Sequence, residues 1–229
     1  MHQELELRLA VPDTSLPALQ AWLETLPGAH SLHLRATYFD TTDRALARAG
    51  WGLRLRREGQ RWVQTMKGPS ADGLSRPEHD VPRGMLPDEA GLPALDLQAH
   101  ALHPQAGAVL AALTETPQPI FGTAIERLLV PLPRAGCALE LALDRGALYA
   151  GTRYARVQEL EIELMGGELP PLFDLADELM ERYGLALEPR SKAARGQALA
   201  RVGAVAPPDF DPAKAQNDLA TLMARVLKV

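Results

Sequence analysis

Charged and apolar side chains alternate along several segments of this chain. Residues 4–9 have the sequence ELELRL, so a β-strand there would place Glu4, Glu6 and Arg8 on one face and three leucines on the other. The same alternation predicts further strands, in segments 33–43, 52–67, 75–82, 119–133 and 137–167. We expect three separate strand segments within 137–167, and a hairpin at 52–68 that turns at Gly59.

Apolar residues recur at helical spacing in other parts of the chain. Segments 13–26, 169–183 and 213–229 are predicted helices, and Gly184 is a C-terminal cap signal. We also expect a helical turn at 45–50, one or two helices within 88–116, and a short strand leading into a helix within 187–203. Roughly eight strands at hairpin-like spacing, with helices between and after them, predict an α+β fold with a closed or strongly curved, mainly antiparallel sheet.

Composition narrows the class of protein. The chain has 229 residues, which suits one large domain or one domain with a small extension. A net charge of −5 and few aromatic residues argue against a nucleic-acid partner. The single cysteine, Cys137, excludes an internal disulfide and is expected to be a buried small residue. No secretory pattern and no apolar run near the roughly 20 residues of a membrane span are present. We therefore expect a soluble, cytoplasmic protein without a membrane partner.

The charged faces of the predicted strands have a consistent sign. Acids dominate the first strand and the row Glu159, Glu161, Glu163, whereas bases dominate 54–67. One interpretation is the solvated face of an ordinary antiparallel sheet. However, solvated faces usually mix signs, and three glutamates in one row repel each other. A bound divalent cation is the simplest compensation.

The alternative interpretation is a barrel with its charged face inward. Glu4 and Glu6 could then face Glu161 and Glu163, and four carboxylates are suited to Mg²⁺ or Mn²⁺. The remaining wall would carry basic side chains, namely Arg54, Arg56, Lys67 and Arg127. Such a cavity suits a small polyanion that carries several phosphates, because arginine and lysine bind phosphate oxygens. Positioning, charge neutralisation and a metal are the requirements of phosphoryl transfer.

These segments resemble a known family. ELELR (4–8) is similar to the ExExK signature of the CYTH superfamily, the triphosphate tunnel metalloenzymes. The resemblance continues in order through YFDT (38–41), GLRLR (52–56), TMKG (65–68), RPEHD (76–80), ERLLV (126–130), ELALDRG (140–146), ELEIEL (159–164) and SKAARG (191–196). It is strongest to bacterial inorganic triphosphatases, which often carry a C-terminal helical CHAD domain. We expect no such domain in a chain that ends after one further helix. The expected division is a CYTH domain at 1–202, then a linker and C-terminal helix at 203–229.

The resemblance implies an eight-stranded antiparallel β-barrel tunnel with flanking helices, one acidic metal side and one basic phosphate side. It assigns Mg²⁺ or Mn²⁺ to the carboxylates Glu4, Glu6, Asp144, Glu161 and Glu163. It assigns the substrate phosphates to Arg8, Arg54, Arg56, Lys67, Arg127, Lys192 and Arg195. Further tunnel acids are Glu78, Asp80, Glu140 and Glu159, and Glu4, Glu6 and Arg8 are the expected catalytic residues. Which acid orients the attacking water is left open.

Arg8 stands where the family has lysine. Arginine keeps the positive charge but is bulkier and does not lose its proton. If the family's lysine only clamps phosphate, activity should survive this replacement. If its ammonium must fit one place between water and phosphate, the rate should fall.

The function implied is metal-dependent hydrolysis of inorganic triphosphate to pyrophosphate and phosphate, and the expected partner is inorganic triphosphate or a short polyphosphate. The alternatives are a thiamine or nucleoside triphosphatase, a class IV adenylate cyclase, and a polyphosphate-binding module without turnover. A scaffold domain with solvated charges is a further alternative. The apolar stripe of the last helix, including Leu219 and Leu222, predicts either core packing or a homodimer contact.

Three histidines and one tyrosine have open roles. His100 and His103 have i, i+3 spacing, and a loop flanked by prolines is favoured there over a metal site. His79 should point away from the tunnel, opposite its acidic neighbours. Tyr38 could contact substrate at a tunnel mouth or be structural.

Overall fold

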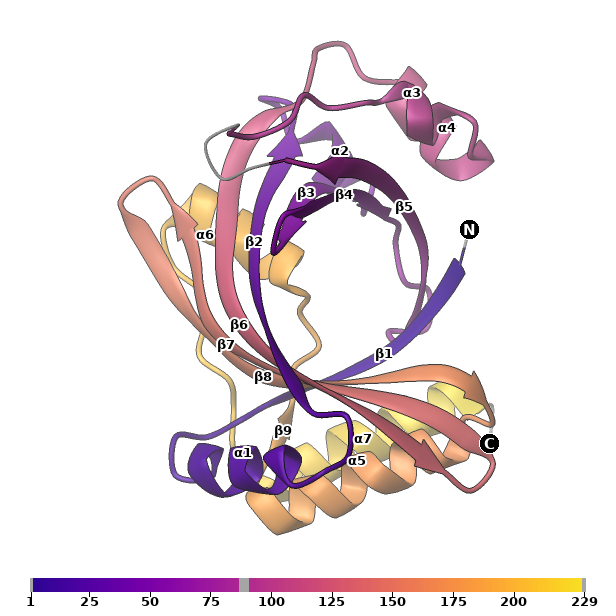
Figure 1. Ribbon diagram of the computed structural model, residues 1–229, viewed down its shortest axis with the longest axis vertical. Coiled ribbons are helices and arrows are strands. Elements are labelled where there is room, and N and C mark those ends of the chain that lie inside the picture. Colours follow the sequence, from indigo (N-terminus) through magenta and orange to yellow (C-terminus); the bar gives the residue numbers. More distant parts are fainter. Residues whose placement is uncertain (1, 87–90, 228–229) are drawn as a thin grey trace.

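Eight antiparallel strands close into a barrel in this computed structural model, which describes residues 2–86 and 91–227. The sheet order is β5-β4-β3-β2-β6-β7-β8-β1, and pairing of β1 with β5 completes the ring. Figure 1 looks along the barrel, with α1, α5 and α7 against its outer side below and α3 and α4 above. The eight-stranded tunnel architecture predicted from the sequence is therefore confirmed.

The strands are β1 (His2–Ala10), β2 (His30–Asp40), β3 (Gly52–Glu58), β4 (Arg61–Lys67), β5 (Ser75–Met85), β6 (Gln118–Arg134), β7 (Cys137–Ala150), β8 (Arg153–Gly167) and the short β9 (Ala186–Leu187). The helices are α1 (Leu16–Glu24), α2 (Ala45–Arg48), α3 (Gln98–Ala101), α4 (Pro104–Ala111), α5 (Pro170–Tyr183), α6 (Lys192–Val202) and α7 (Pro212–Leu227). The expected elements occur, with boundaries shifted by a few residues. The first part of the predicted helical region 88–116, residues 88–90, lies outside the described residues.

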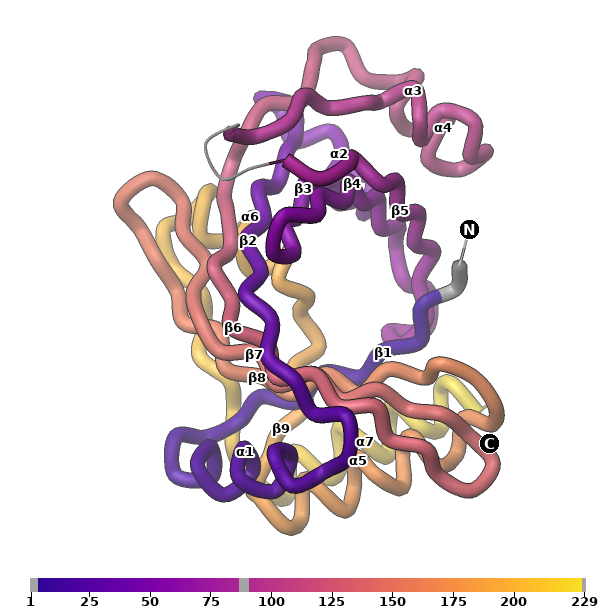
Figure 2. The backbone as a smooth tube through the Cα atoms, in the orientation of Figure 1, coloured from indigo at the N-terminus to yellow at the C-terminus, as the bar shows by residue number. Residues whose placement is uncertain are grey.

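The prediction of three strand segments within 137–167 is wrong. The structure has two long strands, β7 and β8, because Gly146 continues the ladder opposite Ile125 and Val157. A side chain at Gly146 would have its Cβ 2.0 Å from the carbonyl oxygen of Ala124, so this close approach requires glycine. The chain turns only after Ala150, at Gly151, whose φ of 60° is left-handed. Figure 2 shows these strands running as long hairpins past the ring.

The main apolar core lies outside the barrel. Leu7 and Leu9 point away from the charged side chains of β1 and join a cluster with the buried faces of α1, α5 and α7. This cluster includes Phe173 and Leu179 of α5 and Leu219 of α7, all buried. Cys137 is partly buried at its edge. Since helices cover the outer face, the alternating polar face must line the interior.

The helix α6 covers an inner part of the sheet. There the inward positions of β2, β6, β7 and β8 become apolar, and Leu34, Ile125 and Val157 pack with Leu199 of α6. The helix approaches β6 so closely that a Cβ at Gly196 would lie 2.0 Å from the ring of Phe121. This packing explains the glycine that ends SKAARG.

Helices α2, α3 and α4 cover β3, β4 and β5. His79 points outward, as predicted, and its Nδ1 lies 2.9 Å from Nδ1 of His100. The loop favoured around His100 and His103 is wrong for His100, which lies in α3. It holds for His103, which lies in the short connection before Pro104 and caps α4 through a hydrogen bond from the Ala106 N–H. Within residues 2–86 and 91–227, none of the helices combines the length and apolar character that crossing a membrane requires.

Candidate functional site

A cavity of about 790 Å³ lies inside the barrel, and charged side chains from its strands and from α6 line it. Glu4 and Glu6 are only 3% and 6% exposed. This burial rules out the alternative of a solvated sheet face. Most predicted site residues line the cavity, namely Glu4, Glu6, Arg8, Arg54, Arg56, Lys67, Glu78, Asp80, Arg127, Glu140, Glu161, Glu163 and Lys192.

The first-strand acids are paired with bases from two other strands. Arg76 of β5 donates from Nε to Glu4 Oε2 at 2.8 Å and from Nη2 to Glu6 Oε1 at 2.5 Å. Lys67 of β4 donates to Glu4 Oε1 at 2.5 Å. Burial by itself would raise the pKa of Glu4, but Lys67 and Arg76 outweigh that effect and lower it. Arg76 was missed as a ligand from the sequence, although its alternation with Glu78 already placed it on the inner face.

Arg8 is held by its own strand and by the segment before α6. It donates from Nη1 to Glu6 Oε1 and from Nη2 to the carbonyl oxygen of Pro189 at 3.3 Å. Arg8 is buried, yet its Nε has no hydrogen-bond partner among the described residues. A buried donor without a partner is unfavourable, so an anion that accepted its hydrogen bond would remove this cost.

A second ion-paired group lies where β6, β7 and β8 are neighbours. Arg127 donates to both oxygens of Asp144 at 2.7 Å and to Glu161 at 2.5 Å. Lys192 of α6 lies 2.6 Å from both Asp144 and Glu161 and also contacts Glu159. Burial disfavours the charge on Lys192, but these three acids together raise its pKa.

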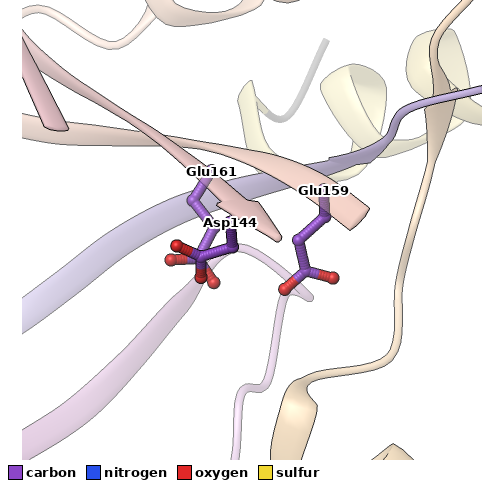
Figure 3. A group of neighbouring side chains, drawn as sticks. All are labelled: Asp144, Glu159 and Glu161. Atoms are coloured by element: carbon purple, nitrogen blue, oxygen red, sulfur yellow. The ribbon is translucent and has the colours of Figure 1, made fainter. Parts of the chain in front are cut away.

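Asp144, Glu159 and Glu161 each bring one carboxylate oxygen within 4.8 Å of the others (Figure 3). This acidic group overlaps the predicted metal set only in Asp144 and Glu161. Asp144 and Glu159 are fully buried, and Arg195 lies behind the cavity wall in contact with Glu159. The protein's own cations therefore offset two of the three glutamates in the β8 row.

Glu163, the third glutamate of that row, has acidic neighbours instead. It is directly opposite Glu6 on β1 and Glu140 on β7. In the part of the chain that the structure describes, no basic side chain forms an ion pair with Glu163 or Glu140. Burial, followed by the charges of Glu4 and Glu6, raises the pKa of Glu163 to about 7. Negative charge is thus under-compensated on this side of the cavity.

Positive charge is under-compensated around Arg56. Burial, followed by the charge of Arg54, lowers the pKa of Arg56, although Glu58 lies 2.5 Å away. The Nε atoms of Arg54 and Arg56 are buried without a hydrogen-bond partner among the described residues. Tyr38 also lines this region, where its hydroxyl accepts a 3.4 Å hydrogen bond from Arg54. The cavity thus has one region that favours a cation and one that favours an anion.

The comparison with protein families agrees with this geometry. The model of the CYTH domain matches residues 2–197. The chain belongs to the CYTH domain family.

Individual relatives of this CYTH domain were also found. An inorganic triphosphatase from Haemophilus influenzae is 33% identical over 204 residues, which are 87% of this chain and 55% of the relative. This chain therefore spans about half the length of that relative.

Solved structures share the fold of this CYTH domain. A candidate adenylate cyclase from Bacillus halodurans has a TM-score of 0.57 at 19% identity, over 84% of this chain and 96% of that chain. The protein HpAC1 from Hippeastrum has a TM-score of 0.57 at 19% identity, over 91% of this chain and 99% of that chain. It is described as a candidate adenylyl cyclase with a dominant triphosphatase activity.

Proposed function

We propose that this chain hydrolyses inorganic triphosphate to pyrophosphate and phosphate inside the barrel, with Mg²⁺ or Mn²⁺ as cofactor. The observation that carries the proposal is an imbalance of charge on two sides of one cavity. Among the described residues, Glu163 and Glu140 have no ion-pair partner on one side, and the buried Nε donors of Arg54 and Arg56 have no hydrogen-bond partner on the other. A metal–polyphosphate complex carries both complementary charges. Membership of the CYTH family and the 33% identical triphosphatase support this choice of substrate.

The basic side chains would bind the polyanion. Arg54, Arg56 and Lys67 project from neighbouring strands β3 and β4, and Arg8 projects from β1. Arg127 and Lys192 would reach the same volume from β6 and α6. Because their positions are held by ion pairs before substrate arrives, they can stabilise charge that develops on phosphate oxygens without large rearrangement. Arg8 would act as a permanent positive clamp, since a guanidinium does not give up its proton.

The acids fit a hard divalent cation. Carboxylate oxygens are the ligands that Mg²⁺ and Mn²⁺ prefer, and Glu4, Glu6, Glu161 and Glu163 face one cavity from the adjacent strands β1 and β8. Asp144 would support this set from behind, through Arg127 and Lys192. When bound, the metal would neutralise phosphate charge and favour ionisation of a water molecule. A neighbouring tunnel carboxylate would orient that water by accepting its hydrogen bond.

The test is phosphate release from tripolyphosphate with Mg²⁺, with Mn²⁺ and with a chelator. We expect release that requires the metal and that Glu6→Gln lowers by at least about a hundredfold, a loss of roughly 2.7 kcal/mol in transition-state stabilisation. Glu178→Gln, which removes an exposed partner of Arg134, is the matched control and should retain full activity. Tight polyphosphate binding without release would contradict the proposal and identify a binding module. Competition with ATP and thiamine triphosphate would show whether an organic group is accepted.

A further inference from the structure

Arg76 occupies the space between the two first-strand carboxylates. It reaches Glu4 and Glu6 with separate nitrogens, at 2.8 and 2.5 Å, and lines the cavity. Its position on β5 is directly opposite Glu4, where β1 and β5 close the barrel. Burial disfavours its charge, but Glu6 and Glu4 together raise its pKa. We propose that Arg76 is an internal counter-ion that must leave these carboxylates when a divalent cation binds, and that it then binds the polyanion.

The proposal rests on the proposed function in that it takes a metal and a polyphosphate as the ligands of this cavity. A metal alone would have to displace Arg76 from Glu4 and Glu6, and Lys67 from Glu4. This leaves Arg76 without its two carboxylates and Lys67 with the longer contact to Glu78. A polyanion alone would have to draw the same bases away, which takes both cations from the buried Glu4 and leaves Glu6 with Arg8. An unpaired buried charge is strongly unfavourable. The two ligands together avoid both costs, because the metal takes the carboxylates and the polyanion takes the bases.

The consequence is linked binding. Each ligand should increase the affinity of the other by the same factor, because coupling between two binding events is reciprocal. The side chain of Arg76 is 14% exposed and lines the same cavity as Glu161, which lies deeper among the charges of β8 and α6. Lys67 shares the exchange, since it already lies between Glu4, at 2.5 Å, and Glu78, at 3.2 Å.

The experiment measures binding rather than turnover. Mn²⁺ is titrated into the full chain with and without diimidotriphosphate, a triphosphate analogue whose P–N–P bridges resist cleavage. Binding is followed by tryptophan fluorescence, and free concentrations are corrected with protein-free blanks. We expect the analogue to tighten Mn²⁺ binding by at least about tenfold, and Mn²⁺ to tighten analogue binding by the same factor.

Arg76→Gln distinguishes a counter-ion from a structural arginine. Without the analogue, this variant should bind Mn²⁺ several-fold more tightly than the parent chain, because Glu4 and Glu6 have lost a competing cation. The factor by which the analogue tightens Mn²⁺ binding should be smaller in this variant than in the parent chain. A structural role predicts weaker binding of both ligands instead. Arg134→Gln, which removes a partly exposed arginine at the end of β6, should match the parent chain in both measurements.

Two results would overturn the inference. One is Mn²⁺ binding that is independent of the analogue. The other is weaker Mn²⁺ binding by an Arg76→Gln variant that has the parent circular dichroism spectrum. Since phosphate release is measured separately, hydrolysis without coupling would refute the counter-ion role alone. Coupling without hydrolysis would refute the proposed activity alone.

Discussion

Arg127 and Asp144 lie directly opposite each other on β6 and β7, joined by two parallel hydrogen bonds of 2.7 Å. Asp144 is completely buried, and Glu161 accepts a third hydrogen bond from the same guanidinium. Two-pronged contacts of this kind fix the orientation of the arginine as well as its position. The pair anchors the wall of the cavity from which Lys192 and Glu161 project.

Arg127→Met should destabilise the fold on the order of 3 kcal/mol, because it leaves a buried aspartate with only part of its compensation. Urea unfolding measures this loss. Asp144→Leu added to Arg127→Met should recover part of it, since the unpaired charge is then gone. Arg134→Met removes an exposed pair with Glu178 and should cost less than about 1 kcal/mol. Equal losses of stability in Arg127→Met and Arg134→Met would contradict the interpretation that the Arg127–Asp144 pair matters because it is buried.

Gly196→Ala should destabilise the protein by about 1–3 kcal/mol, because the added methyl group would overlap the Phe121 ring. It should also slow phosphate release, since α6 carries Lys192 into the cavity. Thermal unfolding and the tripolyphosphate assay measure the two effects. Gly166→Ala is the control and should change stability by less than about 0.5 kcal/mol, because no described residue other than its chain neighbours has an atom within 4 Å of the new Cβ. Phe121→Ala combined with Gly196→Ala should be less damaging than the sum of both.

The raised pKa of Glu163 predicts that the folding stability of the metal-free protein depends on pH. Its pKa is about 7 in the folded state and 4.5 ordinarily, so between these values the folded state holds more protons. Stability from this group is therefore present below pH 4.5 and is lost as the pH rises towards 7. Glu163→Gln should lack this loss and should exceed the parent chain in melting temperature at pH 8 in chelator. Glu181→Gln, an exposed position of α5, should follow the parent curve. A parent-like curve for Glu163→Gln would refute the prediction.

The lowered pKa of His100 predicts that folding stability changes with pH in the opposite direction. Burial and the neighbouring His79 lower the pKa of His100 to about 4, against 6.5 ordinarily. Between pH 6.5 and 4 the unfolded state holds more protons, so stability is lost as the pH falls through this range. Melting curves of His100→Gln should therefore depend less on pH there than those of the parent chain. His33→Gln, an exposed histidine of β2, is the matched control. Parallel curves for the parent and His100→Gln would show that the His79–His100 contact does not resist protonation.

Most of the inner face of the barrel could be predicted from the sequence, because the direction of a side chain along a strand is a local property with a period of two. Glu4, Glu6 and Arg8 share a face for this reason, as do Arg54 and Arg56. The same rule placed His79 outside. The single error in the strand count arose at Gly146, where the backbone continues through a residue that usually marks a turn.

The ion pairs could not be predicted in the same way. The rows of like charge in the sequence suggested separate acidic and basic sides, whereas in the structure bases lie against acids of other strands. The ion pairs Lys67–Glu4 and Lys192–Glu161 join segments that are distant in the sequence. They depend on how those segments are placed against each other, and no local sequence pattern encodes that placement. The burial of Asp144 and Glu159 behind Lys192, and the place of Arg76 between two glutamates, have the same origin.

The sequence by itself determined which residues share a strand face, since alternation is local chemistry. Only the tertiary structure decided that this face is the inside, because closure of β1 on β5 and the packing of α5 and α7 on the outer leucines are long-range events. The same long-range packing decided which charges neutralise each other and which, such as Glu163 and Arg56, keep an imbalance that a ligand can satisfy.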